Sequence, residues 1–284
     1  MASHAAVPFA EPLGGEQVRV YFSSRDRHNR SHTGSLVLDL REPDRLLELS
    51  ADPVLAPGEL GCFDDSGAMA CWLASSGKQR MLYYIGWNLG VTVPFRNSIG
   101  LAISDAGSPF RRYAPGPIVD RSPFEPHFVA SCCVLKGQEG WRMWYLACVG
   151  WELVRGRPRH RYHLRYAESS DGIAWRRDGS VAVNFKDPTE YAISRPCVLR
   201  DGRGWKMWYS TRGERYRIGY AESDDGVRWT RRDDEVGIDV SPRGWDSQMI
   251  EYPHVFDQGG QRYMLYNGND YGRTGIGLAA FEER

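Results

Sequence analysis

Short stretches in which apolar and polar residues alternate recur along the whole chain, separated by turns rich in glycine and aspartate. The clearest example is residues 197–232, where an apolar stretch at 197–199 is followed by aromatic residues at 205–210 and by a third stretch at 218–223 that leads into Trp229. Side chains of a β-strand alternate between two faces, so short stretches joined by Asp/Gly turns predict an antiparallel meander of four strands.

This unit repeats. The residues that align before the apolar pair of each first strand are Pro8, Ala70, Cys132, Pro196 and Pro253. Each is followed by a second strand rich in aromatic residues. Because one meander cannot bury both of its faces, such a repeat predicts a ring of packed meanders. We therefore expect an all-β fold, a five-bladed β-propeller with four-stranded antiparallel blades.

The repeat leaves no room for a second domain, so residues 1–284 are expected to form one domain. The blades are expected at about 1–57, 58–121, 122–186, 187–244 and 245–284, with the two chain ends closing the ring.

Charge and hydropathy narrow the classes of partner. The 36 basic and 36 acidic residues give a formal net charge of zero, so no nucleic-acid or membrane partner is expected. No apolar run approaches the roughly 20 residues of a membrane span, and no secretion signal is visible at the N-terminus. The sequence predicts a cytoplasmic protein.

The six cysteines are expected to be free thiols in a reducing cytosol. Cys71, Cys133, Cys197 and His254 align in the repeat, which is ligand chemistry suited to zinc. Close Cys pairs of the CxxC type are missing, however, and small residues are favoured near a crowded axis. We therefore expect no metal and no cofactor.

Two acidic segments at 167–175 and 221–229 are nearly identical. Asp-Gly between two strands is a strong hairpin signal, so these segments predict structural turns followed by a packed tryptophan. They resemble the Asp-boxes of sialidase propellers, which are structural.

Long connections alternate with short ones. First-to-second and third-to-fourth turns are short, whereas second-to-third loops and the segments leading into each blade are long and rich in Arg, Asn and aromatic residues. Because binding residues concentrate in loops on a rigid scaffold, the face with the long segments is expected to bind the substrate. The expected substrate contacts are Arg25, Arg27, Trp87, Asn88, Arg96, Glu125, His127, Trp151, Tyr191, Arg195, Asp246, Gln248, Glu251, Asn269 and Asp270.

Carboxylates recur in the lead-in segments. Asp64 aligns with Glu190, and Glu125 aligns with Asp246. Carboxyl groups brought to one rim from different blades could act as general acid and base. Asp64, Asp65 and Glu190 are the predicted catalytic residues. Alternatively, acidic residues before a strand satisfy backbone donors or pair with arginines.

Five repeats, acidic lead-in segments and aromatic loops resemble the five-bladed β-propeller glycosidases, the group that includes glycoside hydrolase families 43, 32, 68 and 130. The resemblance implies an Asp as base or nucleophile, matched by Asp64 and Asp65, and a Glu from another blade as acid, matched by Glu190. Arg195 would hold a substrate oxygen or modulate the acid. The chain departs from the family in lacking a clear Asn-Asp-Pro or Arg-Asp-Pro motif.

The expected function is a carbohydrate-active enzyme that cleaves a small glycoside or sugar phosphate by hydrolysis or phosphorolysis, with phosphate as a further partner. Two alternatives remain open. One is a noncatalytic carbohydrate-binding propeller, and the other is a biosynthetic enzyme that reuses the scaffold for a non-hydrolytic reaction.

Overall fold

The computed structural model describes residues 2–105, 107–202 and 204–282, and over these ranges the protein is built almost entirely of β-strands. Residues 1 and 283–284, at the two ends of the expected domain, lie outside the described residues. The helical elements are a 3-10 turn, η1 (Asp233–Glu235), and a single turn, α1 (Asn269–Gly272). No helix in these ranges is long and apolar enough to cross a membrane.

The strands follow one another in antiparallel runs. The first two runs are β1 (Ser3–Gly14), β2 (Gln17–Arg25), β3 (Ser31–Asp39) and β4 (Glu42–Leu49), then β5 (Gly67–Ser76), β6 (Gln79–Leu89), β7 (Phe95–Asp105) and β8 (Arg111–Arg112). The next two are β9 (Val129–Lys136), β10 (Trp141–Val154), β11 (Arg157–Ser169) and β12 (Val181–Val183), then β13 (Ala192–Asp201), β14 (Gly204–Arg212), β15 (Tyr216–Ser223) and β16 (Thr230–Arg231). The last is β17 (Glu251–Gln258), β18 (Gln261–Asn267) and β19 (Ile276–Ala280).

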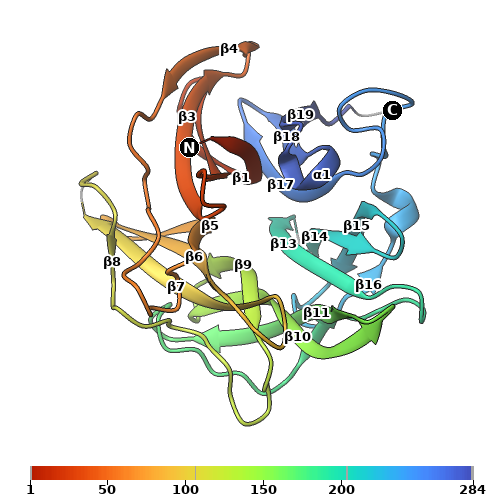
Figure 1. The fold of residues 1–284 in the computed structure, drawn as a ribbon. Helices are drawn as coiled ribbons and strands as arrows, with labels where there is room; N and C mark the ends of the chain where they lie inside the picture. Colours follow the sequence, from red (N-terminus) through yellow and green to blue (C-terminus); the bar gives the residue numbers. More distant parts are fainter. Residues whose placement is uncertain (1, 106, 203, 283–284) are drawn as a thin grey trace.

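These runs are arranged around a common axis in chain order, with their first strands innermost (Figure 1). Single parallel bridges join β3 to β5 and β11 to β13. The expected all-β propeller architecture is confirmed. The expected blade borders at 57, 121, 186 and 244 fall in the segments between runs.

The Asp-Gly segments act as structural turns, as predicted. Asp171 accepts hydrogen bonds from the backbone N–H groups of Ile173 and Ala174 at 2.8 and 2.9 Å. The turn also contacts the preceding run of strands, because the hydroxyl of Tyr83 in β6 donates a hydrogen bond to the carbonyl of Gly172 at 2.8 Å. The second segment behaves in the same way, with the indole of Trp144 donating to Gly226 at 2.8 Å. These contacts attach neighbouring runs to each other.

Every innermost strand carries a β-bulge at its start. The pairing with the second strand shifts by one residue in all five runs, between Ala6 and Phe9 in β1, at corresponding places in β9, β13 and β17, and slightly later, between Ala70 and Trp72, in β5. An extra residue bends the strand and changes the direction of the side chain at that position. In β1, β13 and β17 the bulged residue precedes proline and has a positive φ, at Val7 (53°), Arg195 (52°) and Tyr252 (58°).

The two ends of the chain meet. Asn267, at the end of β18, accepts a hydrogen bond from the Val7 N–H at 2.9 Å and donates to the Ala5 carbonyl at 2.5 Å. β1 therefore lies beside the last run of strands, although more than 250 residues separate them in the sequence (Figure 1).

Several predicted loops are shorter than expected. Residues 24, 25 and 31–33 of the segment 24–33 belong to β2 and β3, and residues 150–161 form a hairpin extension in which Trp151 pairs with His160 and Glu152 with Arg159. In the second segment the reason is cross-strand pairing. The edge-to-face rings of Trp151 and His160 and the Glu152–Arg159 ion pair at 2.6 Å extend the ladder into a segment whose charges suggested an open loop.

Candidate functional site

A cavity of about 170 Å³ lies on the axis, where the innermost strands begin. The residue immediately before each repeat anchor lines it, and in β1, β9, β13 and β17 this residue lies inside the register shift. The five wall residues, as we call them, are Val7, Met69, Ser131, Arg195 and Tyr252. They come from β1, β5, β9, β13 and β17, so every run contributes to the wall.

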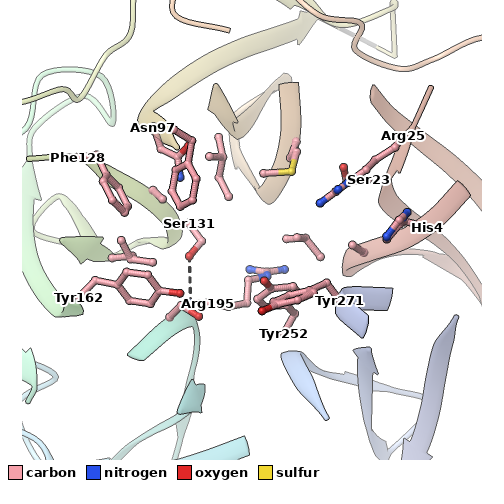
Figure 2. A pocket seen from close by; sticks show the side chains of 18 residues that line it. His4, Ser23, Arg25, Asn97, Phe128, Ser131, Tyr162, Arg195, Tyr252 and Tyr271 are labelled. Atoms are coloured by element: carbon pink, nitrogen blue, oxygen red, sulfur yellow. Dashed lines mark hydrogen bonds between the residues drawn. The ribbon is translucent and has the colours of Figure 1, made fainter. Parts of the chain in front are cut away.

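Side chains from later strands complete the cavity on the side of the second-to-third connections. Aromatic rings of Phe128 and Tyr162 stand on one side, and Arg25, His4 and Ser23 on the other (Figure 2). Phe95 also lines the cavity and packs edge-on against Phe128. Asn97 and Tyr271 add an amide and a phenol. Among the residues that the structure describes, no Asp or Glu lines this cavity.

Arg195 lies at the base of the cavity and is fully buried. Its backbone N–H donates to the Ser131 hydroxyl at 3.0 Å, and its Nη2 donates to the Pro8 carbonyl at 3.0 Å (Figure 2). Its Nε and Nη1 have no hydrogen-bond partner. A guanidinium stays protonated in proteins, so this is a buried positive charge with two free donor groups.

A phenol network stands behind the wall. The hydroxyls of Tyr162 and Tyr216 are 2.5 Å apart, and burial together with the charge of Glu251 raises the pKa of Tyr216 well above its usual value. Glu251 itself is fully buried, and neither of its carboxyl oxygens has a hydrogen-bond partner. Burial raises its pKa well above the usual value of 4.5, although the nearby Arg212 guanidinium opposes the shift.

The structure places the aligned carboxylates inside the sheet runs rather than on the cavity wall. Asp64 is buried and accepts from Arg112 Nε at 2.8 Å and from the Tyr84 hydroxyl at 3.1 Å. Glu190 is also buried and is held by both terminal nitrogens of Arg231.

The other two aligned carboxylates have similar surroundings. Glu125 accepts from the Tyr145 hydroxyl at 2.8 Å and forms an ion pair with Arg165 at 3.0 Å. Asp246 accepts from the Tyr266 hydroxyl at 3.1 Å. Three of the four lead-in carboxylates therefore accept a hydrogen bond from a tyrosine of the second strand. Three pair with arginines, which is the alternative that the sequence left open.

Asp65, the third predicted catalytic residue, is half-buried beside β6. Partial burial opposes its ionisation, but hydrogen bonds from Asn88, from the Gly61 N–H and from Ser66 lower its pKa below the usual value. It is therefore ionised at neutral pH. It does not line the central cavity.

Of the fifteen expected substrate contacts, Arg25 and Arg195 line the cavity. Trp151 and Tyr191 pack against the core cluster near His160. Arg27, Arg96, Gln248 and Asp270 are exposed, and Trp87, Asn88, Glu125, His127, Asp246, Glu251 and Asn269 lie elsewhere, outside the lining. The catalytic and contact assignments stay predictions, but the structure does not gather these residues at one cavity.

Four of the five wall residues were missed, although a signal was present. They directly precede the aligned anchors, and three of the anchors are prolines. A residue before proline is restricted, and a bulge at that place points its side chain away from the strand's regular alternation. The position before each anchor is therefore the sequence feature that predicts the five wall residues.

The aligned thiols lie below the wall. The Cys71 and Cys132 sulfur atoms are 3.8 Å apart, and Cys197 Sγ is 4.0 Å from His254 Nδ1. Within the described ranges, no three His, Cys, Asp or Glu residues are grouped so that they could hold a metal ion.

No protein-family model matches the chain. Two Mycobacterium tuberculosis proteins, MT1551 from strain CDC 1551 / Oshkosh and Rv1502 from strain ATCC 25618 / H37Rv, are each 45% identical to it over 280 residues. The matches cover 99% of this chain and 93% of each relative. Both relatives are called uncharacterized proteins.

Solved structures share the fold at low sequence identity. A glycoside hydrolase matches with a TM-score of 0.76 and 17% identity, covering 99% of this chain and 88% of that one. A thermostable family-43 glycoside hydrolase matches at 0.72 and 16%, covering 99% and 91%. An exo-1,5-α-L-arabinanase from a bovine ruminal metagenomic library matches at 0.68 and 13%, covering 99% and 94%. These likenesses show that the fold is that of the β-propeller glycoside hydrolases.

Proposed function

We propose that this chain, which belongs to the same family as the Mycobacterium tuberculosis proteins MT1551 and Rv1502, is a carbohydrate-active enzyme that acts on a small sugar-derived substrate in the central cavity. The fold supports the proposal, because propellers of this type occur in glycoside hydrolases. One fold can host many reactions, so the proposed function rests on the residues that line the cavity.

The observation that carries the proposal is the lining of the cavity. Apolar ring faces from Phe128 and Tyr162 stand opposite hydrogen-bonding groups from Ser23 and Arg25 (Figure 2). Sugar rings have C–H faces that pack on aromatic rings and hydroxyls that need directed partners. A concave site with a few converging polar groups is the usual form of a small-molecule site.

Acid catalysis needs a carboxyl group that stays protonated near neutral pH. Glu251 meets this condition because burial raises its pKa, and it directly precedes the wall residue Tyr252. We assign Glu251 the role of a proton source behind the wall, which acts through the Tyr252 phenol because Glu251 itself does not line the cavity. Asp64 and Glu190 are held by arginines, and the geometry favours a structural role for both.

A noncatalytic sugar-binding propeller is the second candidate. It is favoured by one observation, the absence of a carboxyl group from the cavity lining among the described residues. A binding protein needs the polar and aromatic wall but no acid.

Turnover of a panel of aryl glycosides and sugar phosphates distinguishes the two candidates. The enzyme hypothesis predicts release of product, and Glu251→Gln is expected to lower the rate by about 10²- to 10⁴-fold while substrate still binds. Glu214→Gln, at an exposed position, is the matched control and should keep the parental rate. Sugar binding without turnover of any panel member would favour the second candidate.

The finer architecture is part of the proposal. We infer that each antiparallel run is one blade, which gives five blades, four of them four-stranded, with β17–β19 as a three-stranded blade among the described residues. The bonds of Asn267 to Val7 and Ala5 support closure of the ring between the last run and β1.

A further inference from the structure

Resting on the proposed role of the cavity in sugar binding, we propose that the cavity base is an oxyanion subsite, where Arg195 binds the carboxylate or phosphate group of a sugar-derived ligand. The ligand class is therefore an acidic sugar, either a sugar acid or a sugar phosphate. The same residues would discriminate against neutral sugars of equal size.

The guanidinium of Arg195 is held in place before any ligand arrives. Its backbone lies in a bulge with φ of 52° before Pro196, which is strained for a residue other than glycine. The Ser131 hydroxyl anchors the backbone N–H, and the Pro8 carbonyl anchors Nη2. These contacts orient the side chain without neutralising its charge.

No acidic group compensates this charge. Among the described residues, no carboxylate lies within ion-pair distance of Arg195, although it is fully buried. A buried charge without a partner carries a large desolvation penalty. An anion in the cavity would supply the missing partner.

Three buried polar atoms without partners meet at this place. They are Arg195 Nε, Arg195 Nη1 and the hydroxyl oxygen of Ser194, and both residues line the cavity. Buried donors are almost always paired in folded proteins, so a cluster of unpaired ones marks a binding site. The Pro8 carbonyl takes one of the two Nη2 hydrogens. The other Nη2 hydrogen and the neighbouring unpaired nitrogen, Nε or Nη1, form a planar fork that matches two oxygens of a carboxylate or phosphate.

Two groups under Arg195 are neutral and cannot replace the anion. Burial raises the pKa of the Cys133 thiol well above its usual value, so this group stays protonated. Burial and the charge of Arg195 hold the pKa of His254 well below its usual value. The Cys71 thiol differs: burial opposes its ionisation, but a hydrogen bond with Cys132 and the charge of Arg195 lower its pKa.

A second arginine, Arg25, adds positive charge at the rim of the cavity. Arg25 lines the cavity and is half-buried, with Nη1 bonded only to the neutral Asn29 at 2.9 Å. With two arginines and no carboxylate among the described lining residues, the field in the cavity favours anions. Asn97 and the Tyr271 phenol leave neutral hydrogen-bonding groups for the sugar hydroxyls.

The test measures binding by calorimetry with four probes: glucuronate, glucose 6-phosphate, glucose and inorganic phosphate. The two acidic sugars are expected to bind at least about tenfold more tightly than glucose, the effect of one charge-assisted contact. Which of the two binds more tightly identifies carboxylate or phosphate as the preferred group. Tighter binding of glucose would overturn the subsite and leave the proposed sugar-binding function standing.

Arg195→Met tests the residue itself, and Arg243→Met, at an exposed position outside the lining, is the matched control. The first variant should lose about 10- to 100-fold in affinity for the acidic sugar and little for glucose, whereas the control should match the parent. Because a methionine removes an unpaired buried charge, the melting temperature without ligand should stay equal or rise. A lower melting temperature with unchanged affinity for acidic sugars would show that Arg195 is structural, and the subsite would be wrong.

Arg195→Lys keeps the charge but not the fork, so it should recover part of the affinity lost in Arg195→Met. Inorganic phosphate separates the two proposals. If it binds in an Arg195-dependent way but no sugar binds, the subsite stands and the sugar function fails. If no anion binds to the parent, the subsite is overturned.

Discussion

Glu190 accepts hydrogen bonds from both terminal nitrogens of Arg231, at 2.6 and 2.9 Å, although the two residues come from opposite ends of one run of strands. Glu190 lies just before β13, and Arg231 ends β16. The ion pair therefore joins the segment leading into the run to its outermost strand.

We predict that Glu190→Gln lowers the free energy of unfolding by about 1 to 3 kcal/mol, because Arg231 loses one of its two carboxylate partners and keeps Asp233. Urea denaturation measures the effect. Glu214→Gln, on the exposed turn of the same run, should stay within about 0.5 kcal/mol of the parent. Unchanged stability together with lost turnover would return Glu190 to the catalytic role predicted from the sequence.

The stability of the protein should depend on the protonation of Glu251. Its pKa is raised in the folded state, so the folded protein binds this proton more tightly than the unfolded chain. The stability contributed by the proton is fully present below about pH 4.5 and is lost as the pH rises through the raised value.

Glu251→Gln cannot lose a proton, so the stability of the parent relative to this variant should fall as the pH rises above about 4.5. The slope is at most about 1.4 kcal/mol per pH unit for a single group. Urea unfolding of both proteins at several pH values from 4 to 8 measures it, and the difference cancels contributions from His254 and other groups. Parallel stability curves would contradict a raised pKa.

Asn267→Ala should weaken the junction between the chain ends. The substitution removes the partners of the Val7 N–H and the Ala5 carbonyl, and each unsatisfied backbone group costs about 1 to 3 kcal/mol. We expect a loss of about 3 kcal/mol in the free energy of unfolding.

Asn29→Gly is the matched control, since Asn29 is exposed and has a φ of 62° that glycine adopts readily. Removal of residues 1–24 should destabilise the whole protein for the same reason as Asn267→Ala. A truncated protein that melts cooperatively at the parental temperature would refute this account of the chain ends.

Thiol labelling should distinguish Cys62 from the other cysteines. Cys62 is half-buried, whereas Cys71, Cys132, Cys133, Cys148 and Cys197 are buried. With Ellman's reagent the native protein should release the equivalent of one thiol rapidly and of all six after denaturation, because burial blocks the access of the reagent. Cys62→Ser should abolish the rapid phase, and a rapid phase that survives in this variant would contradict the burial of the other five.

The strands could be predicted from the sequence because their signal is local. The aromatic stretches at 205–210 and 141–145 predicted strands, and β14 and β10 span them, with their central residues buried on both faces. The Asp-Gly turns were predictable for the same reason, since Asp171 bonds residues only two and three positions away.

The cavity could not be predicted because it depends on distant partners. The alignment of Asp64 with Glu190 was a sound basis for expecting equivalent positions, but their environment is set by Arg112 and Arg231, which lie 48 and 41 residues further along the chain. The one-residue bulges had a similar effect. A shift of one residue moves every later side chain to the other face, so the regular alternation points to the wrong wall positions.

The bulges also separate two roles of a strand residue, packing between sheets and lining the cavity. Elsewhere in the innermost strands a side chain must fit between sheets, so a change there disturbs packing. In four runs the wall residue lies inside the register shift, and in β5 Met69 pairs with Ile85 just before the shift. The wall residue is valine, methionine, serine, arginine or tyrosine in the five runs. Substitution at these five positions can therefore change what the cavity accepts with little effect on the scaffold, and members of the family with different ligands should differ there first.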